Sequence, residues 1–592
     1  MKTSIQCKLL LLLIIFPSST VVTAAEADAT KFRNFLAGSV ENSAPEEFTK
    51  LIYGPLPTQA FSPAPGPAAL FEKMKAGYGK LSPLDVYKGG LGIPTAPTSR
   101  DEIDQLLSKM NSDSSASNRN TLVIVPGIFG EFIKIHAFEE VFSAPSPLQV
   151  QWKNAVAKVP PPGAMDSTFN LHKLNFESQS IEKLISVGTL NDVSGQPLVN
   201  LLVFNTPLLS LESVGNIRQR AAVFLSRLNK YFKIMGTPQH ISFLGYSRGT
   251  MIGLEMLSQA EANPDRYPWL GKVNAMIAVG GVTYGSDLAD VAMGRVAPVS
   301  SAGKGKPAIT QQVQLLKTLS VQLQEVKPLT QIMLDRDERA KHVRNVEAIL
   351  AFNEGMLKSY GFSTEKRQGL RLHIDQLLSN IDTASDILEK SIQANSGADF
   401  GAIIKTVSVV ATQEIRFYTP TEAINTGIRK IKKLIEEALT GVDQLTTAQR
   451  LDWWAKHTIP TSLRYYAVAG TMMDSKSDNP EERAMATNDT AYNPNLVDFR
   501  SLSDNYRDFK KYSGIALNDS QVSPYKVKFW PEFGKTLNPN QPPYEASFLG
   551  VLGVHHWGMA LEIVSDMKSK ELDPYPRMAL LRALMATVAS ND

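Results

Sequence analysis

Cysteine is almost absent from this sequence of 592 residues: only Cys7 occurs, and it precedes an apolar run near the N-terminus. An acylated lipoprotein cysteine would follow such a run, so lipid attachment is not expected. The rest of the chain has no cysteine, which excludes disulfides, a cysteine nucleophile and a thiolate metal site. A strong charge excess is also lacking, because the formal net charge is +3 and Lys2 and Lys8 lie in that N-terminal stretch. This balance gives no indication of nucleic-acid binding.

Long apolar runs are lacking as well. Leu9 to Phe16 is too short to span a bilayer, and no later run reaches about 18 residues. Basic residues before this run and the small-residue sequence Val22-Thr-Ala24 predict a signal peptide over residues 1–24, with an uncleaved anchor as the alternative. We therefore expect an exported protein, periplasmic or extracellular, with contact to a lipid surface that is at most peripheral.

Apolar runs of strand length alternate with helical patterns in two parts of the chain, 121–290 and 449–592. This alternation predicts a doubly wound, mostly parallel α/β sheet, whose ligands bind at the carboxyl ends of the strands. A further strand is expected before the turn Asn518-Asp519, and a helix is expected from Met559 to Met567. The predicted strands are Leu122–Val125, Leu201–Phe204, Ile241–Leu244, Val273–Val279, Leu463–Ala469 and a run from Ser547.

Two other parts of the chain follow different patterns. Residues 25–120 read as an irregular segment that wraps the core, with one short amphipathic helix at Arg100–Met110. Residues 291–448 show helical spacing and almost no strand signal, clearest from Leu370 to Leu388. We interpret this part as an all-helical insertion. It is either a purely structural element or a cap or lid over the sheet, and nothing in the sequence identifies a partner for it.

One stretch joins a predicted strand to a predicted helix through a tight turn. It runs from His240 to Leu257 and contains Gly245-Tyr246-Ser247-Arg248-Gly249. A serine at the apex of such a turn adopts a strained backbone, and the two glycines remove side chains that would collide there. Ser247 is therefore the predicted nucleophile, and a tight turn without chemistry is the alternative.

A serine hydroxyl needs a base, and in doubly wound hydrolases the chain order is serine, acid, histidine. Of the eight histidines, those before Ser247 fail this order, and His342, His373 and His457 lie in unsuitable places. His555 and His556 remain, and we favour His556. Asp519, 37 residues earlier, is the predicted acid, with Asp474 and Asp478 as competitors. Backbone N–H groups of Arg248 and Ile128 are the expected oxyanion donors.

These pieces together resemble the α/β-hydrolase lipases and esterases secreted by bacteria. The resemblance is carried by Pro126-Gly-Ile-Phe-Gly130, the serine turn, Val282-Thr-Tyr-Gly-Ser-Asp-Leu-Ala-Asp290, Asn518-Asp-Ser-Gln-Val522 and His555-His-Trp-Gly558. It implies the triad Ser247, Asp519 and His556. The sequence departs from the family pattern at Tyr284, where the family has histidine, and at Ser520, where it has glycine.

We therefore expect a serine hydrolase that cleaves a small-molecule or lipid ester without a metal or an organic cofactor. Apolar residues near the site favour an acyl chain, namely Ile128, Phe129, Leu208, Leu209 and Trp557. Two other hypotheses stay open. The same machinery could cleave an amide or a thioester, or the chain could be a non-catalytic binding protein on a hydrolase scaffold.

Overall fold

The computed structural model describes residues 24–40, 52–53, 66–89, 97–111, 119–127, 146–157, 185–204, 216–295, 436, 439–474, 477–488, 506–507, 509–510, 513–559 and 576–592. Three predictions from the sequence lie wholly or largely outside these residues. They are the signal peptide apart from Ala24, the helical insertion between residues 296 and 435, and the helix expected after Met559.

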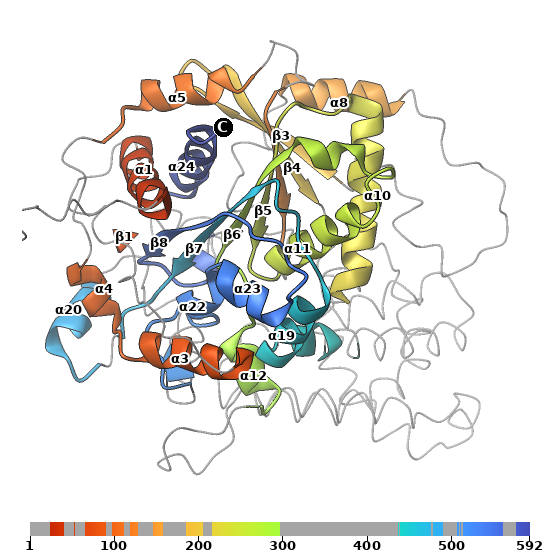
Figure 1. The fold of residues 1–592 in the computed structure, drawn as a ribbon. Helices are drawn as coiled ribbons and strands as arrows, with labels where there is room; N and C mark the ends of the chain where they lie inside the picture. The colour runs from red at the N-terminus through yellow and green to blue at the C-terminus, as the bar shows by residue number, and fades with distance from the viewer. Residues whose placement is uncertain are drawn as a thin grey trace, which may run out of the picture.

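A single mostly parallel sheet runs through the described residues (Figure 1). Its strand order is β1-β8-β7-β6-β5-β2-β4-β3, and only the edge strands β1 and β3 pair antiparallel to their neighbours. The predicted mostly parallel α/β sheet is therefore confirmed. The strands are β1 Ile52–Tyr53, β2 Thr121–Val125, β3 Ile185–Asn191, β4 Pro197–Phe204, β5 Ile241–Tyr246, β6 Val273–Val279, β7 Arg464–Gly470 and β8 Ala546–Leu552.

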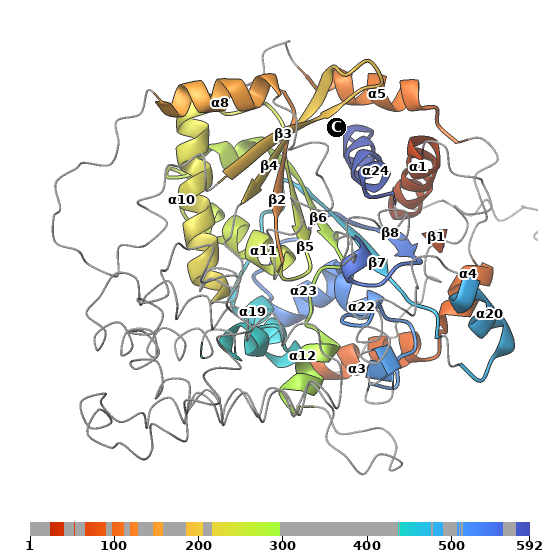
Figure 2. The same cartoon turned by 180° about the vertical axis from the view of Figure 1, so that it is seen from behind.

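Helices cover both faces of this sheet (Figures 1 and 2). Alternate strand residues face opposite ways, so Val123 and Phe243 belong to one buried cluster while Leu122 and Leu244 belong to the other. Helices α1 (Ala24–Ser39), α5 (Arg100–Lys109) and α24 (Arg577–Ala589) cover the second cluster. The first lies under α3 (Pro67–Gly79), α8 (Pro147–Ala157), α10 (Ile217–Met235), α11 (Arg248–Glu261), α19 (Thr447–Lys456), α22 (Pro524–Val527) and α23 (Pro531–Leu537).

The remaining described elements are short. They are the helices α4 (Pro83–Gly89), α12 (Asp287–Ala292) and α20 (Pro480–Asn488), and the 3-10 helices η5 (Pro268–Lys272) and η7 (Trp557–Met559). No helix among the described residues is both long enough and apolar enough to cross a membrane.

The expectation of an irregular segment over 25–120 is wrong for its described residues, which hold α1, α3, α4, α5 and β1. The prolines misled the interpretation, because Pro67 and Pro83 begin helices α3 and α4, where a missing N–H costs little. The helix expected at Arg100–Met110 is confirmed as α5. It starts with a capping box in which Ser99 and Glu102 each accept a hydrogen bond from the other's backbone N–H.

Candidate active site

Ser247 stands between strand β5 and helix α11, with φ of 54° and ψ of −125°. A positive φ is strained for any residue with a side chain, so the predicted strained apex is confirmed. The flanking glycines are required by space. A Cβ at Gly245 would lie 2.4 Å from Thr250 Cα, and one at Gly249 would lie 1.9 Å from the carbonyl oxygen of Val125. The turn therefore closes only with glycine at both positions.

The His556 imidazole lies between the serine and a carboxylate. Its Nε2 is 2.8 Å from the Ser247 hydroxyl oxygen, and its Nδ1 is 2.7 Å from Oδ2 of Asp519. A carboxylate only accepts hydrogen bonds, so Nδ1 donates to Asp519, and Nε2 of the neutral ring accepts from the serine hydroxyl. His556 and Asp519 are 1% and 0% exposed. Low exposure strengthens these polar contacts because little water competes with them.

The Asp519 carboxylate is fixed by its own turn. Its Oδ1 accepts hydrogen bonds from the backbone N–H groups of Gln521 at 3.0 Å and Val522 at 2.8 Å. The Asn518 side chain accepts from the Ser520 N–H at 2.8 Å, which tightens the same turn. These bonds leave Oδ2 directed at His556, so the side chain is oriented before any substrate binds.

The strand expected immediately before Asp519 is wrong. Residues 514–517 belong to no strand of the sheet. The adjacent strand β7 already pairs with β6 on one side and β8 on the other, so it has no free edge. Side chains bind the segment instead: the Tyr506 hydroxyl donates to Ala516 O at 2.9 Å, and Asn518 Nδ2 donates to Ile515 O at 3.1 Å.

The alternative base and acids lie in other surroundings. Nδ1 of His555 accepts a hydrogen bond from the Gly558 N–H at 2.8 Å, so that imidazole is engaged within its own loop. Asp474 has its Oδ2 3.6 Å from Lys510 Nζ, and Asp478 is exposed. The structure therefore brings His556 and Asp519 to Ser247, and these alternatives make their contacts elsewhere.

Two glycines end neighbouring strands beside the base and the acid. A Cβ on Gly280, after β6, would lie 2.7 Å from Met559 Cε and in ordinary contact, at 3.4 Å, with the His556 ring. A Cβ on Gly470, at the end of β7, would lie 2.5 Å from the carbonyl oxygen of Val554 and 3.2 Å from Asp519 Cβ. Sequence reasoning missed both residues. The sequence feature that could have identified them is a glycine directly after each predicted buried strand.

One of the two expected oxyanion donors lies in the described residues. Arg248 is the first residue of α11, so its backbone N–H lies at the N-terminus of that helix, where the helix dipole favours negative charge. Ile128 lies outside the described residues, but Gly127 beside it is buried against the serine turn. A Cβ on Gly127 would lie 3.1 Å from Ser247 Cβ. The chain after β2 thus begins next to the candidate nucleophile.

The structure does not test the expectation that the site favours an acyl chain. Ile128, Phe129, Leu208 and Leu209 lie outside the described residues, and so does the side chain of Trp557.

No protein-family profile matches the chain, and a search of curated proteins gave no match either. Among solved structures, a metagenomic carboxyl esterase is similar to it with 14% identity and a TM-score of 0.33, over 81% of this chain and 77% of that one. A likeness this distant carries no argument about activity. The evidence for the fold and the site geometry is therefore the structure alone, with its mostly parallel sheet and flanking helices.

Proposed function

We propose that the chain is a serine hydrolase that cleaves carboxylic esters through an acyl-enzyme. The observation that carries the proposal is the continuous hydrogen-bonded chain from Ser247 through His556 to Asp519, with both contacts under 3 Å. A strained serine, a buried imidazole and an oriented carboxylate are what an activated hydroxyl nucleophile needs. The prediction of Arg248 and Ile128 as backbone oxyanion donors belongs to the same proposal.

The reaction follows from these positions. Ser247 Oγ attacks the ester carbonyl carbon while its proton moves to His556 Nε2, and Asp519 stabilises the imidazolium that forms. The backbone N–H groups at the start of α11 and after β2 hold the negative oxygen of the tetrahedral intermediate. His556 then gives its proton to the departing alkoxide. A water molecule, deprotonated by the same imidazole, releases the acid and restores the serine.

The proposed substrate is a small-molecule or lipid ester. An apolar pocket wall, predicted from the sequence around Ile128 and Leu208, suits an acyl chain better than a charged group. An amide or a thioester would use the same three side chains, so the leaving group must be settled by assay. A panel of nitrophenyl esters, acyl thioesters and peptide anilides separates the three.

A fluorophosphonate probe, which reacts with activated serines, tests the proposal directly. We expect the wild-type protein to be labelled and Ser247→Ala to lose all labelling. The matched control is Ser242→Ala, which removes a fully buried serine hydroxyl from the same strand, β5, and should leave labelling intact. An unlabelled, folded wild-type protein would contradict the proposal and favour a binding protein on this scaffold.

Export is a second part of the proposal. Helix α1 begins at Ala24, and its residues Phe32 and Leu36 are buried against the second core cluster. Removal of residues 1–24 during secretion to the periplasm or the medium would therefore leave the packing of Phe32 and Leu36 intact. N-terminal sequencing of protein from that compartment tests it, and a retained leader would refute the cleavage.

A further inference from the structure

Tyr246, the residue immediately before the candidate nucleophile, contacts the candidate base. Its hydroxyl donates a hydrogen bond to the carbonyl oxygen of His556 at 2.7 Å, across 310 residues of chain. Its ring centroid lies 5.3 Å from the imidazole centroid, with the two planes 33° apart. Tyr246 is 3% exposed, so this contact is shielded from water.

The backbone of His556 lies beyond the end of strand β8. Strand β8 ends at Leu552, and residues 553–556 continue beyond it without pairing in the sheet. Both main-chain polar groups of His556 are nevertheless bound, because its N–H donates to Asp519 O at 2.8 Å and its carbonyl accepts from Tyr246. The backbone that carries the imidazole is therefore tied to the acid on one side and to the serine turn on the other.

We propose that Tyr246 is a positioning residue that sets the register between His556 and Ser247. This inference rests on the proposed function. Ser247 and Tyr246 are adjacent in one turn, so a hydrogen bond from Tyr246 fixes the base relative to the nucleophile that it must reach. Without that bond the buried His556 carbonyl would lack its donor, and the loop would shift to find another.

The tyrosine hydroxyl keeps its proton under working conditions. Burial raises the pKa of Tyr246 well above its ordinary value, and the nearby Asp519 charge raises it further, against a smaller lowering by Arg577. The group therefore remains a donor across the range in which an esterase is assayed.

Tyr246→Phe removes the donor and keeps the ring. We expect kcat to fall about tenfold with KM little changed, because the interaction acts on catalytic geometry and not on substrate binding. Fluorophosphonate labelling should slow by a similar factor. The matched control is Tyr465→Phe, which also removes a buried hydroxyl that donates to a main-chain carbonyl, that of Pro460 at 2.6 Å, but away from the site.

A spectroscopic measurement separates positioning from loss of stability. The proton on His556 Nδ1, shared with Asp519, should give a downfield resonance in the free wild-type protein. We expect it to move or broaden in Tyr246→Phe and to be unchanged in Tyr465→Phe. Replacing Tyr246 by 4-aminophenylalanine, which still donates, should restore both the resonance and the rate. Replacing it by 4-methylphenylalanine, which fills the volume without donating, should not.

The outcomes are distinguishable. A wild-type protein that hydrolyses esters, with Tyr246→Phe within about twofold of it in rate and unchanged in the resonance, overturns this inference and leaves the proposed function standing. A wild-type protein that neither hydrolyses nor is labelled overturns the proposed function itself. If Tyr246→Phe does not fold, the amino and methyl variants decide the question, and equal rates for those two overturn the inference.

Discussion

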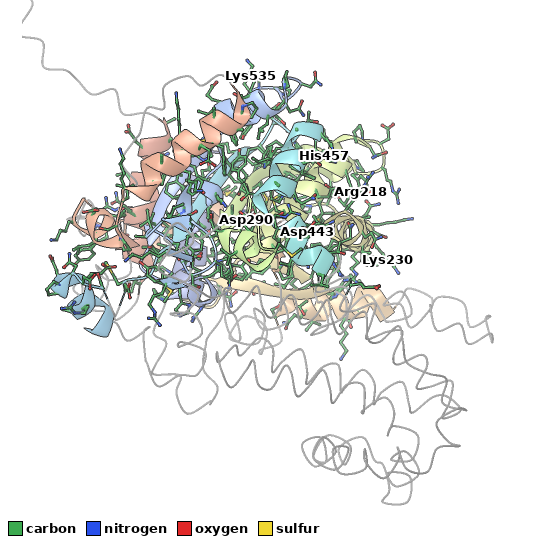
Figure 3. The ribbon with its side chains drawn as sticks, turned by 90° about the horizontal axis from the view of Figure 1, so that it is seen from below. Arg218, Lys230, Asp290, Asp443, His457 and Lys535 are labelled. Carbon is green, nitrogen blue, oxygen red and sulfur yellow. The ribbon has the colours of Figure 1, made fainter. Side chains whose placement is uncertain are left out.

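Asp290 and Thr447 lie 157 residues apart in the sequence and are joined by two hydrogen bonds. Oδ1 of Asp290 accepts from the Thr447 backbone N–H at 2.8 Å, and Oδ2 accepts from the Thr447 hydroxyl. Lys526 Nζ reaches both residues, at 3.2 Å from Asp290 Oδ2 and 2.7 Å from Thr447 Oγ1. A second contact lies close by in the sequence, where Arg295 binds Asp443; Asp290 and Asp443 are labelled in Figure 3. The described residues before position 296 and those after position 438 are thus bonded to each other at this junction.

This junction predicts that residues 296–435, the larger part of the insertion predicted from the sequence, can be removed. With residues 296–435 replaced by a short flexible linker, we expect a folded core that still reacts with a fluorophosphonate, because the two ends are held together by core residues. Thermal unfolding and labelling measure this. Adding Asp290→Ala to the shortened chain removes the junction and should lower its melting temperature. A shortened chain that does not fold would show that the insertion is part of the core.

The acid can be assigned by comparing two buried aspartates. In Asp519→Asn the amide can donate to Nδ1 and so favour the imidazole tautomer that cannot accept the serine proton. We expect kcat to fall by about 10⁴-fold with KM little changed. Asp474→Asn is the control, since Asp474 lies beside Lys510 and not beside His556, and should keep near wild-type kcat. The kcat of both variants is measured with nitrophenyl esters. A large loss of kcat in Asp474→Asn and not in Asp519→Asn would identify Asp474 as the acid.

Ser520 adopts a backbone conformation that serine disfavours. Its φ is 83°, and its buried hydroxyl has no hydrogen-bond partner among the described residues. Ser520→Gly should therefore raise the free energy of unfolding by about 1 kcal/mol. Ser523→Gly is the matched control: that serine has φ of −89° and donates to Asp287 at 2.8 Å, so its loss should destabilise the fold. Chemical denaturation measures both changes, and destabilisation by Ser520→Gly would contradict the prediction.

The lowered pKa of Lys528 predicts that the stability of the fold depends on pH. Burial near the rings of Trp530 and Phe548 lowers the pKa of Lys528 to about 8, below its value in the unfolded chain. Between that pH and the ordinary lysine pKa the unfolded chain binds more protons, so this residue makes the free energy of unfolding rise with pH. Lys528→Met should remove the rise and stabilise the protein near pH 7.

Lys526→Met is the contrasting control for that substitution. Lys526 pairs with Asp287 at 2.6 Å and Asp290 at 3.2 Å, so its loss leaves two buried carboxylates without their cation. We expect it to destabilise the fold by about 3–5 kcal/mol. Denaturant unfolding at pH 7 and pH 9.5 measures both variants. A Lys528→Met protein that keeps the wild-type pH slope would refute the role of Lys528.

The local elements could be predicted because short-range chemistry determines them. Buried strands such as Leu122–Val125 are apolar runs, and helix α5 begins at a capping box within four residues of chain. The serine turn belongs to this group as well. Gly245 is required by contact with Thr250 in the same turn, so the local sequence already indicates the strained serine, whereas Gly249 is required by the distant Val125 at the end of β2.

Features that depend on contacts between distant segments could not be predicted from the sequence. The segment before Asp519 has the composition of a strand, but it joins no strand of the sheet, and β7 beside it is already paired on both edges. The choice between His555 and His556 is of the same kind. Adjacent residues in an unpaired loop point in different directions, and here Tyr246 and Asp519 fix those directions through bonds to the backbone of His556.

The sequence by itself determined that the chain forms a parallel α/β sheet with a serine on a strained turn, because strand runs, glycines and helix caps act over a few residues. Only the tertiary structure decided which imidazole and which carboxylate reach Ser247. That decision depends on hydrogen bonds and strand pairings between segments as far apart as Tyr246 and His556, and no local pattern records which partners will meet.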